Sequence, residues 1–109
     1  MIYTIFIIPF LMILIGVLVF KYPPKKINSF IGYRTSKSMK NQKNWNFANN
    51  YAGKLSINIG IIMTFFSIIL FIINYYSILN FTENTLLIIT FSELIILILL
   101  MFRVEKKIK

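Results

Sequence analysis

The sequence has no cysteine, no histidine and no aspartate, and only three acidic residues among its 109. Without cysteine it can form no disulfide and offers no thiolate metal ligand or thiol nucleophile. Without histidine it lacks the commonest metal ligand and proton shuttle. We therefore expect neither a metal site nor a cofactor, and any function has to come from apolar, amide, hydroxyl and basic side chains.

Long apolar runs, by contrast, make up most of the chain: residues 2–20, 55–79 and 84–102. A helix rises about 1.5 Å per residue, so about 20 residues cross a hydrocarbon layer of about 30 Å. The first and third runs have 19 residues and fit this length, whereas the second has 25 and has to tilt or begin in the interface. The pattern predicts a single all-α domain, an integral membrane three-helix bundle.

Basic residues are confined to one side of these three runs. Eight of the twelve lie in the loop 21–54, which has no acid, and four follow the third run. Because basic residues next to membrane helices are retained in the cytoplasm, loop and tail are predicted to be cytoplasmic, with the N-terminus and the short hairpin 80–83 outside. The formal charge of +9 then favours anionic lipids as partners rather than nucleic acid.

The three acids argue against catalysis. Glu83 and Glu105 fall on opposite faces of the membrane in this topology, and Glu93 falls at its midplane. No two of them can share general acid and base chemistry. We expect a protein that is not an enzyme.

The loop 21–54 is predicted to contain a cytoplasmic interfacial helix between the first and second spans. Pro23 and Pro24 end the first span, because a residue before proline avoids helical angles. Helix should resume near Ser36 or Ser38, either of which can cap it, and turn into the second span or continue as it. Trp45 would lie at headgroup depth and anchor the segment.

Two features inside the spans bear on packing. Pro9 should kink the first helix, because it lacks an N–H and its ring clashes with the preceding turn. In the second helix small residues recur every four positions, a ridge that would let the first span, the third span or a second copy in a homo-oligomer approach closely. The ridge consists of Ala52, Ser56, Gly60 and Thr64.

Glu93 is an ionisable residue at the middle of the third span, where a charge costs several kcal/mol unless it is neutralised, hydrated or paired. Ser67 lies at the same depth in the second span, and Thr64 is one turn away. Their hydroxyls could hydrogen-bond a neutral carboxylic acid and join the helices. The alternative is a proton or ligand site, although a proton relay normally contains several acids or histidines.

A polar motif in the loop carries the most specific signal. It runs Asn28-Ser-Phe-Ile-Gly32-Tyr33-Arg34-Thr35, and is followed by Ser38, Trp45, Ala48, Asn49, Gly53 and Lys54. From about residue 24 to 60 this pattern resembles the SdpI-type family of membrane immunity proteins. The resemblance implies a multi-pass protein of the bacterial cell membrane that protects its cell from a membrane-active peptide toxin or bacteriocin.

The motif has a physical reading beside the resemblance. The guanidinium of Arg34 can hold a phosphate or carboxylate with two parallel hydrogen bonds, and Gly32 lets the backbone approach a ligand. Asn28, Thr35 and Asn49 could complete a polar cluster under Trp45. Equally, Arg34 could cap the first helix or bind lipid phosphate, with Asn28 and Thr35 shaping the turn.

We therefore expect a binding site formed by Asn28, Gly32, Arg34, Thr35, Trp45, Asn49 and Glu93. The first hypothesis is immunity, with a peptide toxin as partner. The second, which the resemblance also suggests, is a membrane signalling scaffold that sequesters a cytosolic regulator through its basic loop. A third is proton-linked transport through Glu93.

Overall fold

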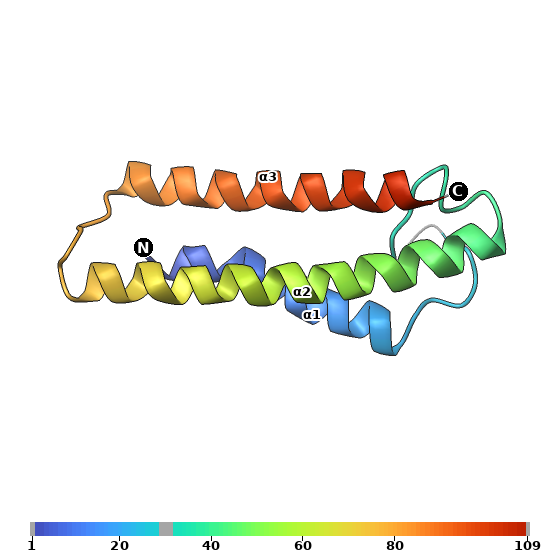
Figure 1. The fold of residues 1–109 in the computed structure, drawn as a ribbon, viewed down its shortest axis with the longest axis horizontal. Helices are drawn as coiled ribbons and strands as arrows, with labels where there is room; N and C mark the ends of the chain where they lie inside the picture. Colours follow the sequence, from blue (N-terminus) through green and yellow to red (C-terminus); the bar gives the residue numbers. More distant parts are fainter. Residues whose placement is uncertain (1, 29–31, 109) are drawn as a thin grey trace.

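The computed structural model describes residues 2–28 and 32–108, and this part of the chain contains helices and no strand. A short 3-10 helix, η1 (Ile2–Phe6), leads into α1 (Ile7–Lys21), followed by α2 (Gln42–Tyr75) and α3 (Glu83–Lys107). Three helices, with η1 and α1 counted as one, are long and apolar enough to cross a membrane. The helices form an elongated bundle about 52 Å long (Figure 1). The all-α, three-span prediction is confirmed at this level.

The first span ends just before the paired prolines, as the sequence predicts. α1 ends at Lys21, immediately before Tyr22 and the two prolines. Near the start of α1, Pro9 has no N–H, so it cannot donate the usual helical hydrogen bond to the carbonyl of Ile5. Ile5 itself belongs to the 3-10 helix η1. The hydroxyl of Ser67 donates to that carbonyl instead, at 3.2 Å. The backbone group that proline leaves without its helical partner is therefore satisfied by α2.

α2 is one continuous helix of 34 residues that begins later than Ser36 or Ser38. Its N-cap is Asn41, whose side chain accepts a hydrogen bond from the backbone N–H of Asn44 at 2.8 Å. The predicted caps are wrong because Ser38 is used within the preceding turn. At the other end the helix stops at Tyr75 rather than at residue 79, and Ser77 takes a φ of +57° that ends the helical path.

The closest helix contact is between α1 and α2, which run antiparallel. A Cβ on Gly16 would lie 3.0 Å from the carbonyl oxygen of Gly53, and one on Gly60 would lie 3.2 Å from that of Pro9. Ser56 adds a hydrogen bond of 2.7 Å to the carbonyl of Met12. Glycine thus allows backbone to meet backbone, as is common between membrane helices.

The predicted small-residue ridge lies mostly on the side of α2 that packs against α1. Ser56 and Gly60 contact α1, and Thr64 lines a recess together with residues of α1 such as Ile13 and Val17. A row at spacing four drifts around a helix with 3.6 residues per turn, and Ala52, at one end of the row, packs in the core beside Val104 of α3. Gly53 and Ser67 also contact the first span, and α1 is the helix that fills the ridge.

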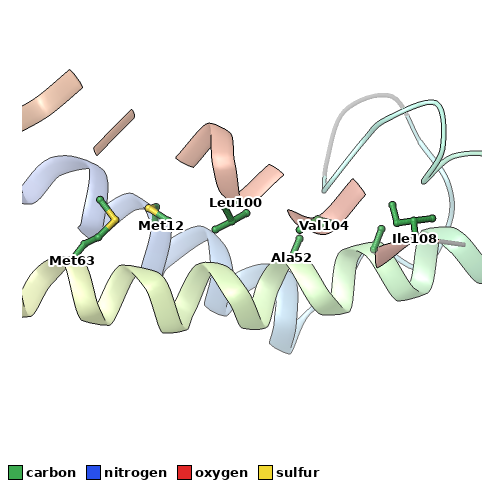
Figure 2. Packing of buried hydrophobic residues seen from close by; sticks show 7 residues of the cluster. Met12, Ala52, Met63, Leu100, Val104 and Ile108 are labelled. Atoms are coloured by element: carbon green, nitrogen blue, oxygen red, sulfur yellow. The ribbon is translucent and has the colours of Figure 1, made fainter. Parts of the chain in front are cut away.

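α3 returns along α2 after a short hairpin. Thr82 caps it by accepting from the N–H of Thr85 at 3.2 Å, and it extends five residues beyond the predicted 84–102. Its apolar stripe of Leu100 and Val104 packs against Ala52 (Figure 2). Toward its C-terminal end α1 diverges from α3 (Figure 1), which leaves space between the two helices at that end of the bundle.

Candidate functional site

The connection between α1 and α2, residues 22–41, folds back over that space, and we call its described part the elbow. Gly32 has a φ of +99°, a left-handed value that residues other than glycine rarely adopt. The turn directs the N–H of Tyr33 to the side-chain oxygen of Asn49 in α2, at 2.7 Å. Asn49 is buried and its amide nitrogen donates to the carbonyl of Trp45. Gly32 and Asn49 therefore fix the elbow to the first turns of α2.

A second turn in the elbow is closed by Thr35 and Ser38. The N–H of Thr35 donates to the hydroxyl of Ser38 at 2.8 Å, and the N–H of Ser38 donates to the hydroxyl of Thr35 at 3.1 Å. Ser38 is buried and reaches the carbonyls of Thr35 and Tyr33 as well. This reciprocal pair orients the hydroxyl of Thr35 toward α3.

Glu105, near the end of α3, receives these elbow groups. Its carboxylate oxygen Oε1 accepts from the hydroxyl of Thr35 and from that of Tyr33, the latter at 2.9 Å. Its backbone carbonyl accepts from Nζ of Lys37 at 3.1 Å. Burial, and then the hydrogen bond and charge of Glu105, raise the pKa of the Tyr33 phenol far above its usual value. Tyr33 thus stays protonated and donates, and three elbow side chains bind the elbow to α3.

Trp45 anchors the other half of the elbow. It is fully buried, and its indole N–H donates to the carbonyl of Pro24 at 2.6 Å. Its neighbour Asn44 donates to the carbonyl of Lys37 at 3.0 Å. The chain on both sides of the undescribed residues 29–31 is therefore hydrogen-bonded to the first turn of α2.

Beneath the elbow lies a pocket of about 560 Å³. Apolar side chains of α1 and α3 form two walls, among them Val19 and Leu97, and α2 contributes small residues such as Gly53. The elbow residues 32–35 close the end. The pocket exists because α1 has diverged from α3, and the elbow covers only part of the opening.

The structure brings together most of the predicted site residues. Gly32, Thr35, Trp45 and Asn49 belong to one hydrogen-bonded unit, and Arg34 is exposed on it and lines the pocket. Asn28 donates to the carbonyl of Lys26 at 2.9 Å. Thr35 and Asn49 of the predicted polar cluster are joined to this unit through Ser38 and Tyr33.

Three important residues were missed as site members: Tyr33, Ser38 and Glu105. Tyr33 and Ser38 stand within or next to the motif, but their roles depend on which carbonyls and carboxylates the fold brings near. Glu105 had a signal in the sequence, since it is the one acid among the basic residues on its side of the spans. An acid in such surroundings is expected to have a specific partner.

Glu93 lies apart from this unit, in the middle of α3, and is 5% exposed. The two hydroxyls predicted to bond it do not, because Ser67 and Thr64 donate to backbone carbonyls. Its oxygen Oε1 has no hydrogen-bond partner within the described chain. The proposed hydroxyl contact between α2 and α3 is therefore wrong.

This observation makes a prediction about stability. An unsatisfied buried polar atom costs about 1 to 3 kcal/mol, so Glu93→Leu is expected to unfold at the same temperature as the native protein or a higher one in detergent. Glu93→Gln keeps a buried polar group and should give no such gain. If Glu93→Leu is instead the less stable, Glu93 has a partner from outside the chain, such as water or a second copy.

Comparisons with known proteins agree with the architecture. Residues 25–103, which include most of the elbow, all of α2 and most of α3, match the model of the SdpI/YfhL protein family. A protein of Bacillus subtilis (strain 168) described as uncharacterized protein YfhL is 49% identical over 53 residues, which are 49% of this chain and 48% of that protein. The aligned region thus spans about half the length of this relative, and no solved structure matches the chain. With three membrane-length helices and a family match over most of its length, this multi-pass membrane protein belongs to the SdpI/YfhL protein family.

Proposed function

We propose that this protein gives its cell immunity against a membrane-active peptide toxin or bacteriocin. The observation that carries the proposal is the elbow, a hydrogen-bonded polar unit over a lateral pocket, most of which lies in the part of the chain that matches the family. Such a unit is suited to contact an amphipathic molecule that enters from the bilayer, because it presents polar groups beside an apolar wall. Binding there would hold the toxin, or occupy the place it needs, without any catalytic step.

The proposal includes an orientation in the bacterial cell membrane. Lys21 is the last residue of α1, Lys54 lies over the ring of Phe20, and Arg103 donates to the hydroxyl of Tyr51. These three basic residues therefore lie at the elbow end of the bundle, which we place in the cytoplasm together with the C-terminus. α2 would be about 51 Å long at 1.5 Å per residue, more than the hydrocarbon layer of about 30 Å requires. Its polar first turns, residues 42–54, would then extend through the cytoplasmic interface, with the stacked rings of Phe47 and Tyr51 at headgroup depth.

The experiment is protection of a sensitive host. Cells that express the chain are challenged with a panel of membrane-active peptides, and survival above that of empty-vector cells is expected for at least one peptide. Glu105→Ala should lower the protection at equal membrane abundance, because the hydroxyls of Tyr33 and Thr35 lose the carboxylate that binds them to α3.

Glu83→Gln is the matched control, since it removes an acid at the opposite end of the bundle and should leave protection unchanged. Survival equal to that of empty-vector cells across the panel would contradict the immunity proposal. Equal protection by the Glu105 and Glu83 variants would contradict the role of the elbow.

The exposed lysines of the elbow and of the first turn of α2 favour a second candidate, a scaffold that sequesters an acidic cytosolic regulator. Lys25, Lys26, Lys40 and Lys43 are all exposed. A photo-crosslinker at position 40 should then capture a cytosolic protein, and a crosslinker at Ile61, which faces lipid, should not. Capture of lipid alone at position 40 would contradict the scaffold.

A further inference from the structure

We infer that the pocket beneath the elbow binds a single anionic phospholipid, with its phosphate at Arg34 and one acyl chain along the apolar walls between α1 and α3. This inference concerns a resident lipid and does not depend on the immunity proposal. It follows from three properties of the pocket: its lining, its charge and its position in the membrane.

The lining fits an acyl chain. Leu18 and Val19 form one wall, and Leu97, Leu100 and Met101 form the other. The volume of about 560 Å³ lies within the usual range of about 300 to 1,000 Å³ for small-molecule sites. Unfilled apolar space of this size is unfavourable between packed helices, because its lining atoms lose their dispersion contacts. A hydrocarbon chain is the occupant that a bilayer supplies.

The charge selects an anion. Arg34 is the one basic residue among the described residues that line the pocket, and none of them is acidic. A planar guanidinium matches a phosphate with two parallel hydrogen bonds better than it matches a zwitterionic headgroup whose ammonium lies close by. A cationic amphiphile would meet Arg34 with like charge.

The position gives the lipid access. Leu18 and Met101 line the pocket, yet they are 49% and 46% exposed, so the rim between α1 and α3 opens sideways to the hydrocarbon. Arg34 lines the same pocket as Val19 and Met101, each of which is two residues before a basic residue at the end of its apolar run, Lys21 and Arg103. A phospholipid in that leaflet can therefore place its phosphate at the elbow and insert one chain laterally, without leaving the bilayer.

The test is native mass spectrometry of the full chain in detergent micelles, with phosphatidylglycerol and phosphatidylcholine of identical acyl chains as probes. The first phosphatidylglycerol should bind about tenfold more tightly than phosphatidylcholine, and Arg34→Ala should remove that preference. Arg103→Ala is the matched control, because it deletes an exposed arginine of α3 at the same end of the bundle as Arg34, and Arg103 does not line the pocket. Its effect on the preference for phosphatidylglycerol should be about twofold or less. Soluble glycerol phosphate should not displace the bound lipid.

A second variant probes the apolar part. Val19→Phe fills the wall without changing any charge and should weaken the binding of the first phosphatidylglycerol, with Arg34 intact. Arg34→Lys should keep only part of the preference, because an ammonium cannot form the bidentate contact. The emission of Trp45, the sole tryptophan, reports whether each variant keeps the elbow docked.

Each remaining outcome would overturn the inference. Equal losses in the Arg34 and Arg103 variants would mean diffuse attraction to anionic lipid. Unchanged binding by Val19→Phe would place the lipid elsewhere, and displacement by glycerol phosphate would mean that the site holds a free phosphate rather than a lipid.

Discussion

Replacement of Gly60 by leucine is expected to separate α1 from α2 and to give one of the two largest losses of stability in this protein. A Cβ at this position would lie 2.7 Å from Cγ1 of Ile13 and 3.2 Å from both the backbone nitrogen of Ile13 and the carbonyl oxygen of Pro9. Side chains can rotate away, but backbone atoms cannot unless the helices move apart. Overpacking of this kind costs about 1 to 3 kcal/mol.

Separation of the helices adds to that loss. Ser67 would no longer satisfy the carbonyl of Ile5, which has no N–H at Pro9 to pair with, and Ser56 would lose the carbonyl of Met12. In the apolar interior of a membrane an unpaired backbone carbonyl has no water to replace the lost donor. We therefore expect a total loss of about 3 kcal/mol or more for Gly60→Leu, and a smaller loss for Gly60→Ala.

Thermal unfolding in a mild detergent measures this series. Ile61→Phe is the matched control, because it adds bulk to the neighbouring residue, which is 55% exposed on the lipid-facing side, and should leave the transition unchanged. If Gly60→Leu unfolds at the same temperature as Ile61→Phe, the two backbones do not meet at Gly60 and the α1–α2 packing described here is wrong.

The fold could be predicted from the sequence because its strongest constraints are local. The apolar runs set the number of spans, and Pro23 with Pro24 ends the first one wherever the helices pack. The start of α2 was not accessible in this way, since Ser36, Ser38 and Asn41 are all good caps. In the fold Ser38 is used in a turn with Thr35, whose hydroxyl also binds Glu105, and Asn41 is left to cap the helix.

The candidate site follows the same division. Gly32, Trp45 and Asn49 could be recognised from the motif, because they lie close together in the sequence and their spacing can be read from it directly. The partner of the elbow on α3 could not, since Glu105 is some seventy residues away in the sequence and nothing in the motif points to it. Glu93 shows the reverse error: two hydroxyls at matching depth suggested a contact, but helix rotation decides which groups face each other.

The elbow itself depends most on Gly32, for two separable reasons. Its φ of +99° lies in a region where a Cβ causes backbone strain of about 1 to 3 kcal/mol. A Cβ there would also overlap Oδ1 of Asn49 and lie 2.8 Å from Cγ of Pro24. Asn49, a residue of α2, is buried, and its amide nitrogen donates to the carbonyl of Trp45. Its side chain therefore cannot move aside without breaking the hydrogen bond from the N–H of Tyr33.

Gly32→Ala is therefore expected to release the elbow from α2 while the three spans stay helical, with a loss of about 2 to 5 kcal/mol from strain and overlap together. The emission of Trp45 should shift to the red, and its indole ring should become accessible to acrylamide. The reason is that Pro24, which accepts the indole N–H, lies in the segment that is released. Gly32→Ala with Asn49→Ala should not restore the native emission, because it removes the overlap with Oδ1 but also the acceptor for the N–H of Tyr33. Ser36→Ala, in the exposed part of the same elbow, should leave Trp45 unchanged. Native emission in Gly32→Ala would show that the elbow is not held through Gly32, and the contact between Tyr33 and Asn49 would lose its structural role.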